Sequence, residues 1–353
     1  MENSPVTLEA EGHICLIETV REDLPARLAA LTKPRRGLIL LDHAFRHEAE
    51  LFARNFPDFK VIFARHRGEE AKTIEETQAI FEALAEGKYS RDDWFIVRGG
   101  GSLTDMGAFC AGLYKRGMNL ILVPTTLLGA VDAAVGGKTA INFYGAKNQI
   151  GHFYLPAHVL VDLPSFRTLP AERLSEGLVE AYKTGLLFDA ELARLAEEET
   201  DSLLAGDQRL LAEVAGRSYA AKAALVAGDF REEKGVRDVL NLGHTYGHVA
   251  ESFYAPELSH GRAVAIGLAV AAELSRPALG AAKADRIIET AARLGGPWPE
   301  LPPDEDARRL LMTDKKIRGG RLRFILLDDF EKPVLKEIEA DEILDAARRV
   351  IRN

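Results

Sequence analysis

The first half of the chain alternates short apolar runs with helical patterns, and this alternation limits the possible folds more than any other feature. Strands that alternate with helices are typical of a parallel, doubly wound α/β sheet. The run Leu38-Ile39-Leu40-Leu41 is continuously apolar, which suits burial on both faces. Strands are predicted at 13–20, 37–42, 60–64, 94–98, 119–124 and 158–162, with helices near 24–31, 46–55, 72–86 and 104–115.

The second half has a different character. After Pro170, long segments rich in Ala, Leu, Glu and Arg are helical by composition and period. The predicted helices are 171–188, 190–204, 208–227, 236–253, 263–273 and 281–294. This change predicts a boundary between 163 and 170, and we expect one domain at 1–165 and another at 166–353.

Composition excludes several classes of protein. The 353 residues include 45 Lys+Arg and 54 Asp+Glu, and the net charge of -9 argues against general nucleic-acid binding while permitting a local basic pocket. Cys15 and Cys110 are too few for a disulfide framework, so a reducing cytosol is the expected compartment. The sequence has no secretory leader pattern and no apolar run of about 18 residues, so no membrane span is expected.

A glycine-rich turn, Gly99-Gly100-Gly101-Ser102, directly follows the predicted strand 94–98. Glycines at a strand-to-helix turn let backbone N–H groups approach a phosphate at the helix N-terminus. The turn therefore favours a nucleotide or sugar phosphate ligand. A tight turn without a ligand is the alternative.

Residues 131–147 form a loop-like segment that contains Asp132, Lys138 and Lys147 and is followed by Asn148. The two lysines are candidates for binding an anionic substrate, and a solvated loop is the alternative. The sequence Gly-Gly-Lys-Thr at 136–139 is similar to the end of a P-loop. It lacks the first glycine of that motif, so a Walker A interpretation is poor.

His244 and His248 are four residues apart, and His260 follows at an expected helix start. Such a pair has a metal-ligand spacing, although the Glu of the HExxH motif is missing. Spacing alone makes these three histidines candidate ligands, and hydrogen-bonded structural histidines are the alternative.

Glu180 and Lys183 share a helical face. In isolation that pair is better explained as a surface ion pair.

Taken together, these segments resemble the 3-dehydroquinate synthase family of sugar phosphate cyclases. The resemblance covers about residues 37–330, and many ordered motifs make it specific. It implies an N-terminal Rossmann-like NAD-binding α/β domain and a C-terminal, mainly α-helical, metal-binding domain. The motifs are GGGSLTD (99–105), YKRG (114–117), PTTLL (124–128), VDAAVGGKTAIN (131–142), GAKNQIG (145–151), TLPAERLSEGLVEAYK (168–183), RDVLNLGHTYGH (237–248), SHG (259–261) and DKK (314–316).

The resemblance implies one divalent metal, usually zinc and alternatively cobalt, held by Glu180, His244 and His260. His248 then becomes an active-site residue instead of a ligand. Three protein ligands with open positions are the expected layout of a catalytic zinc site. The family usually reads His-Gly-Glu where this chain has Arg262 as the third residue. This difference places an additional positive charge near the predicted metal.

The resemblance also implies contacts with NAD. Acidic side chains suit ribose hydroxyls and disfavour a 2′-phosphate, so NAD is expected in preference to NADP. The implied positions are Asp42, Glu69, Lys72, Gly99, Gly100, Gly101, Asp105, Thr125, Thr126, Lys138, Lys147 and Thr168.

The family substrate is a small anionic sugar phosphate, 3-deoxy-D-arabino-heptulosonate 7-phosphate, whose carboxylate and phosphate require cationic partners. Lys222 is matched only by allowing one extra residue before Arg237. Arg116 is similar to a family arginine that reaches the neighbouring subunit's site, which implies a homodimer. The implied substrate contacts are Arg116, Asp132, Lys138, Lys147, Asn148, Lys183, Lys222, Arg237, Asn241, His248 and one of Lys315 or Lys316, with Lys315 chosen.

The resemblance implies a lyase that oxidises its substrate only transiently with NAD. Another sugar phosphate cyclase and a metal-dependent polyol dehydrogenase are alternatives within enzymes. A nucleotide-binding regulatory module is the non-enzymatic alternative. The crowd of lysines and arginines disfavours a polyol dehydrogenase, since a neutral substrate needs no such cluster. Nucleic acids and membranes are not expected partners.

Overall fold

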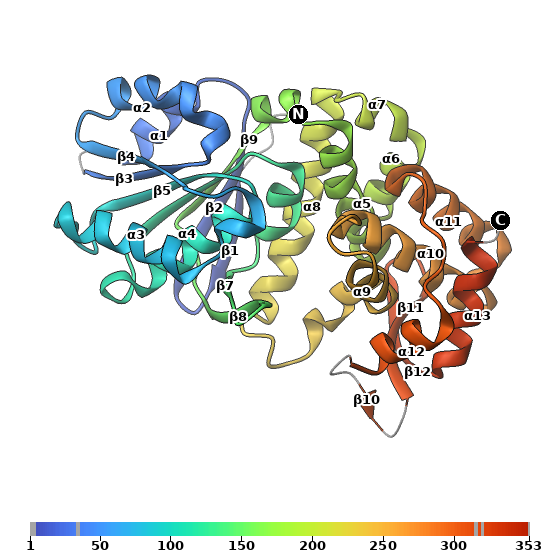
Figure 1. Cartoon of the computed structure of the whole chain (residues 1–353). Helices are drawn as coiled ribbons and strands as arrows, with labels where there is room; N and C mark the ends of the chain where they lie inside the picture. Colours follow the sequence, from blue (N-terminus) through green and yellow to red (C-terminus); the bar gives the residue numbers. More distant parts are fainter. Residues whose placement is uncertain (1–4, 33–35, 314–316, 319–320, 352–353) are drawn as a thin grey trace. The chain divides into compact units, whose positions relative to one another are not determined.

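The computed structural model describes residues 5–32, 36–313, 317–318 and 321–351, and the chain forms two compact units (Figure 1). The first unit contains Met1–Leu169 and Lys222–Glu233, and the second contains Pro170–Ala221 and Lys234–Asn353. The order of predicted elements divides the chain once and does not indicate that residues 222–233 return to the first unit. The functions expected of the two domains stay predictions.

The first unit is built on a seven-stranded sheet with the order β1-β2-β9-β6-β5-β3-β4. Neighbours from β2 to β4 are parallel, and β1 pairs with β2 in the antiparallel direction. The predicted doubly wound α/β class is confirmed, although β1 was not predicted. The strands are β1 (Val6–Ala10), β2 (His13–Val20), β3 (Gly37–Leu41), β4 (Phe59–Phe63), β5 (Trp94–Gly99), β6 (Asn119–Pro124) and β9 (His158–Asp162).

Helices cover both faces of this sheet, and successive side chains of a strand pack into a core on one face or the other. On one face, Leu28 of α1 and Phe52 of α2 pack with Ile39 and Ile96. On the other, Gly107 of α4 lies directly against Val97, where a Cβ atom would be 2.5 Å from the valine side chain. The helices of this unit are α1 (Leu24–Thr32), α2 (Ala49–Asn55), α3 (Ile74–Glu86) and α4 (Gly101–Leu113).

The strand order reverses between β3 and β5. From β3 the chain moves outward to β4 and then returns to β5 on the opposite side of β3. Ligands of open α/β sheets bind outside the carboxyl ends of the strands at such a switch point. Here those ends carry Asp42 and the glycines 99–101. The topology therefore directs a ligand to the glycine-rich turn.

Residues 138–153 form a β-hairpin, so the expected loop at 131–147 is wrong over its second half. Strands β7 (Lys138–Phe143) and β8 (Ala146–Phe153) pair in the antiparallel direction. Tyr144 and Gly145 both have positive φ, at 52° and 75°, as a two-residue type I′ turn requires. The predicted lysines and Asn148 thus lie on an ordered hairpin.

The second unit is mainly helical, as predicted, with a small antiparallel sheet that was not predicted. Helix α10 packs against α5, α9, α11 and α13. Among the described residues, every helix is too short or too polar to cross a bilayer. The elements are α5 (Ala171–Phe188), α6 (Ala190–Glu198), α7 (Thr200–Leu204), α8 (Gln208–Gly228), α9 (His244–Phe253), α10 (His260–Leu279), α11 (Ala281–Gly295), α12 (Asp304–Thr313), α13 (Ala340–Ile351), β10 (Ile317–Arg318), β11 (Arg321–Asp329) and β12 (Lys332–Ile338).

Gly267→Ala is expected to lower the free energy of unfolding by about 3 kcal/mol, the upper part of the range for overpacked cores. A Cβ atom at Gly267 would lie 1.7 Å from the carbonyl oxygen of Gly243, so α10 and the start of α9 would have to separate. Gly228→Ala is the control, because a Cβ atom there meets nothing within 4 Å. Urea denaturation measures both variants. Equal stability of the two would contradict the close approach.

Candidate metal centre and ligand-binding residues

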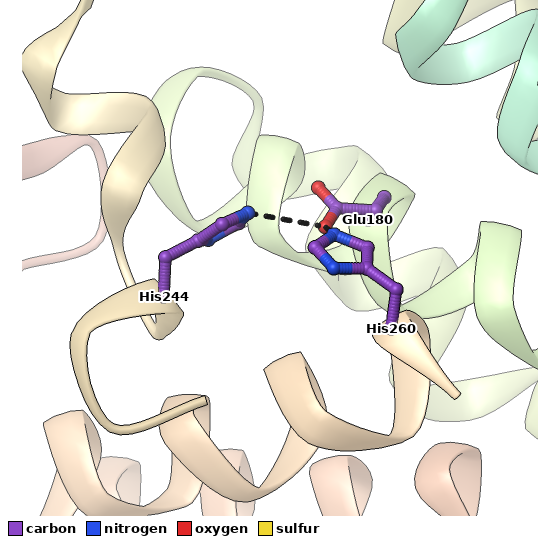
Figure 2. Close-up of side chains that lie close together, drawn as sticks. All are labelled: Glu180, His244 and His260. Atoms are coloured by element: carbon purple, nitrogen blue, oxygen red, sulfur yellow. Dashed lines mark ion pairs between the residues drawn. The ribbon is translucent and has the colours of Figure 1, made fainter. Parts of the chain in front are cut away.

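Glu180, His244 and His260 converge in the second unit (Figure 2). They come from α5, the first residue of α9 and the first residue of α10. The Nε2 atoms of His244 and His260 lie 3.6 Å and 3.4 Å from Oε1 of Glu180. One candidate ligand atom from each residue lies within 4.8 Å of the others. Carboxylate and imidazole groups in this number suit zinc or cobalt.

Both histidine rings are oriented by a partner on their other nitrogen. Nδ1 of His244 lies 3.2 Å from the carbonyl oxygen of Leu242. Nδ1 of His260 lies 3.1 Å from Oε2 of Glu251. Each ring therefore presents Nε2 toward Glu180, which is the arrangement expected of metal-binding histidines.

The carboxylate of Glu180 is buried, with 2% of its side chain exposed, and forms an ion pair with Lys183. Neither of its oxygens accepts a hydrogen bond of acceptable geometry. A buried charge with unsatisfied oxygens is costly unless it is paired or coordinates a metal. The orphaned oxygens and the donor set therefore fit a divalent cation.

The charges of this cluster keep Glu180 ionised. Burial opposes its charge, yet Lys183 and the two histidines hold the pKa of Glu180 well below its ordinary value. Burial lowers the pKa of His244 to about 3, with Lys183 adding to the effect. Burial alone would lower the pKa of His260, but the neighbouring carboxylates of Glu180 and Glu251 raise it to about 10. A bound cation would require His260 to lose its proton, since a metal ligand must be the neutral imidazole.

Two interpretations from local sequence are wrong here. Glu180 and Lys183 do not form a surface ion pair, because only 2% and 4% of their side chains are exposed. The three histidines are not the group that the structure brings together, since Glu180 takes the place of His248. His248 lies one turn along α9, with its ring centroid 5.4 Å from that of His244.

Arg262 does not leave a free charge beside this cluster. Its Nε donates to the carbonyl oxygen of Gly295 at 3.1 Å, and its guanidinium also donates to the carbonyl oxygen of Pro297 at 2.5 Å. A cation at the C-terminus of α11 is favourable for the helix dipole. The departure from the family pattern therefore serves the packing of α10 against α11.

In the first unit, the glycine-rich turn lies at the sheet's switch point. The amide of Asp42 donates to Arg98, and the amide of Thr125 donates to Gly99, both at 2.9 Å. A Cβ atom on Gly100 would lie 3.5 Å from Thr126. No side chain caps the N-terminus of α4, so its first amide groups suit an anionic ligand.

The predicted dinucleotide contacts form one hydrogen-bonded network with Asn148. The buried Nζ of Lys72 donates to Oδ2 of Asp105 at 2.9 Å and to Oδ1 of Asn148. Glu69 accepts hydrogen bonds from Ser102 at 2.8 Å and Asn142 at 2.9 Å. Burial raises the pKa of Asp105 to about 6, against the opposing charge of Lys72.

Asn142 is a member of this network that sequence reasoning did not single out. Its side-chain oxygen accepts a hydrogen bond from the backbone amide of Asn148 at 2.9 Å. Its backbone amide donates to the backbone carbonyl oxygen of Lys72 at 2.8 Å. Asn148 has a φ of 54°. Asn142 thus helps to fix the unusual backbone of a predicted substrate contact. Its place in the quoted motif was the only available signal.

The segment 222–233 carries two further groups to the first unit. Nζ of Lys222 donates to the backbone oxygen of Asp132 at 2.5 Å and also binds its carboxylate. Lys138 forms an ion pair with Glu232, a residue that the sequence did not indicate. The return of the chain therefore brings Lys222 to Asp132 and Glu232 to Lys138.

The other predicted residues are placed as follows. Lys183, Arg237, Asn241 and His248 belong to the second unit, and Arg116, Lys147 and Thr168 to the first. Arg237 is 4% exposed. Thr168 closes a 3₁₀ helix by donating to the carbonyl of Ser165 at 3.0 Å. Lys315 and Lys316 lie outside the described residues.

Comparison with known proteins gives consistent matches. Residues 62–176 match the family "3-dehydroquinate synthase N-terminal", and residues 177–317 match "3-dehydroquinate synthase C-terminal". A 3-dehydroquinate synthase of Pseudomonas aeruginosa (strain UCBPP-PA14) is 44% identical over 290 residues, which are 80% of this chain and 78% of that protein. These matches extend across both units.

Two solved structures are similar over nearly the whole chain. A 2-epi-5-epi-valiolone synthase from Streptomyces hygroscopicus subsp. jinggangensis, with NAD+ and Zn2+ bound, has a TM-score of 0.86 and 27% identity, and covers 98% of each chain. A 2-deoxy-scyllo-inosose synthase with carbaglucose-6-phosphate, NAD+ and Co2+ has a TM-score of 0.85. At 22% identity, and covering 98% of this chain and 99% of the other, the second shows a shared fold alone.

Proposed function

The chain belongs to the 3-dehydroquinate synthase family, and from this premise we propose that it converts 3-deoxy-D-arabino-heptulosonate 7-phosphate to 3-dehydroquinate and phosphate. The observation that carries the proposal is the cluster of Glu180, His244 and His260, in which Glu180 is buried and its carboxylate oxygens lack hydrogen-bond partners. NAD and a divalent metal, zinc or cobalt, are the proposed cofactors. Similar solved enzymes hold NAD+ with Zn2+ or Co2+.

When bound, NAD accepts and later returns a hydride at C5 of the substrate, while the metal acidifies the C5 hydroxyl and polarises the ketone. Glu180, His244 and His260 would hold the metal. Residues 1–165 would bind NAD through the glycine-rich turn, Asp42 and the network around Lys72. Residues 166–353 would form the metal- and substrate-binding domain.

The substrate carries a carboxylate and a phosphate, and this chain has cations for both. We assign Lys138, Asn148, Arg237 and His248 to the phosphate, where they help it to take the departing proton during elimination. Lys183 and Lys222 would bind the carboxylate and hydroxyl groups, because an ammonium group donates to either. The ketone formed at C5 makes the neighbouring C–H acidic, so phosphate can leave. Re-reduction, ring opening and aldol closure complete a net lyase reaction.

The remaining expectations extend this proposal. Arg116 would reach a neighbouring subunit's site in a cytoplasmic homodimer. Lys115, Arg116 and Gly117 have positive φ values of 49°, 64° and 114°, so the chain bends sharply where this arginine is presented. Family resemblance supports the homodimer, and the scarcity of cysteine supports the compartment.

Incubation with the heptulosonate phosphate, NAD and Zn2+ or Co2+ tests the proposed reaction. Phosphate release, measured colorimetrically, should equal 3-dehydroquinate formation, with no accumulation of NADH at 340 nm, since the hydride returns in every turnover. NADH that accumulates with turnover would indicate a dehydrogenase. Turnover of a different sugar phosphate, with none of the heptulosonate phosphate, would indicate another sugar phosphate cyclase.

A further inference from the structure

We propose that Glu251 is a positioning residue of the metal centre, whose carboxylate holds the His260 ring so that Nε2 faces Glu180. The proposal rests on the metal centre of the proposed function. It adds a residue that is not one of the three candidate ligands, Glu180, His244 and His260. Oε2 of Glu251 lies 3.1 Å from Nδ1 of His260, on the side of the ring opposite Glu180. Glu251 is itself largely buried, with 17% of its side chain exposed.

The periodicity of α9 explains how Glu251 reaches this position. His244, His248 and Glu251 are at positions i, i+4 and i+7, which lie on one face of an α-helix. Helix α9 thus supplies one candidate ligand from its first residue and the partner of another ligand two turns later. A single rigid element links the two histidines.

The two histidines differ in what restrains them. His244 is mostly buried, with 14% of its side chain exposed, and its Nδ1 faces a neutral backbone carbonyl. The side chain of His260 is 35% exposed, and it begins a helix that no side chain caps. Packing therefore restrains His260 less, and a charged hydrogen bond contributes more to holding its ring. Charge-assisted hydrogen bonds are about twice as strong as neutral ones.

Charge balance gives a second reason for a carboxylate here. The cluster lies at the N-termini of α9 and α10, where helix dipoles disfavour a cation, and Lys183 adds a positive charge. Glu180 alone does not neutralise a divalent metal together with Lys183. Glu251 supplies a second negative charge without occupying a coordination position, and it strengthens the imidazole as a donor.

The test compares Zn2+ and Co2+ affinities of the full-length chain and Glu251→Gln, measured without substrate by competition with a chromophoric chelator. Loss of the charged partner should weaken metal binding ten- to a hundredfold, the usual effect of such partners. The visible spectrum of bound Co2+ should also change, because the ring is reoriented. Glu257→Gln removes an exposed charge three residues before His260 and should leave both properties unchanged.

A double-mutant cycle separates positioning from general damage. In a His260→Ala background, Glu251→Gln should cause no further loss of metal affinity, since its partner is gone. Glu251→Asp keeps the charge and should retain part of the metal affinity. It therefore serves as the test variant if Glu251→Gln folds poorly. An affinity of Glu251→Gln within twofold of the unaltered chain would overturn the proposal. Failure of the unaltered chain to bind either metal would overturn the metal centre itself, and this proposal with it.

Discussion

Glu180→Gln is expected to abolish stoichiometric metal binding and to lower kcat/KM at least about a thousandfold, which corresponds to about 4 kcal/mol of transition-state stabilisation. Glutamine has the same shape, but a neutral amide oxygen is a poor ligand for zinc. The change also leaves Lys183 buried without its counter-charge. Elemental analysis of the purified protein and steady-state kinetics measure the two effects.

The matched control for this change is Glu172→Gln, at an exposed position in the first turn of the same helix. It removes the same charge from α5 and should change kcat/KM less than twofold. Thermal unfolding of both variants separates loss of metal from loss of fold. Full metal content in Glu180→Gln would contradict the ligand assignment.

The strands of the parallel sheet were predictable because their side chains are buried on both faces. Strand β3 is buried at every position, and its apolar run marked it within one residue of its true end. The hairpin β7–β8 has no such run, since most of β8 is exposed. Its turn pair, Tyr144-Gly145, was the only local signal. An exposed hairpin therefore cannot be predicted from a pattern of hydrophobic residues.

The metal centre shows the limit of local reasoning more clearly. Histidine spacing located α9, but Glu180 was identified only through family resemblance, because a Glu and a Lys three residues apart usually lie on a surface. Burial of this pair depends on α5, α9 and α10 meeting, which no single segment encodes. The partner of His260, Glu251, depends on the same tertiary contact.

Burial of cations is the structural property that sequence could not supply. Lysine and arginine are almost never fully buried unless they are paired. Among the described residues that are buried, the Lys and Arg side chains are Lys72, Arg98, Lys183, Lys222 and Arg237. Four of these five were implied as cofactor or substrate contacts. The exception, Arg98, donates to Asp162 and Ser165 and stacks on Phe45, 3.8 Å from the ring centroid. Its role is to join the carboxyl ends of β5 and β9.

Lys222→Met should raise KM for the heptulosonate phosphate at least tenfold and lower kcat/KM by about a hundredfold. Hydrogen bonds to charged groups contribute about 1.5–3 kcal/mol each, which is ten- to about 150-fold. Lys222 is 6% exposed, so water does not readily replace its ammonium group. The change also deprives Asp132 of its ion pair. Initial rates over a range of substrate concentrations measure both constants.

Lys60→Met is the control, because Lys60 forms an exposed ion pair with Glu86 at 3.2 Å, and such pairs contribute little. It removes the same charge and should leave KM within twofold. NAD affinity should be unchanged in both variants, since Lys222 binds Asp132 and not the network around Lys72. The assignment of Lys222 depends on one extra residue before Arg237, and its contact with Asp132 is what supports that alignment. An unchanged KM would mean that the alignment selects the wrong lysine.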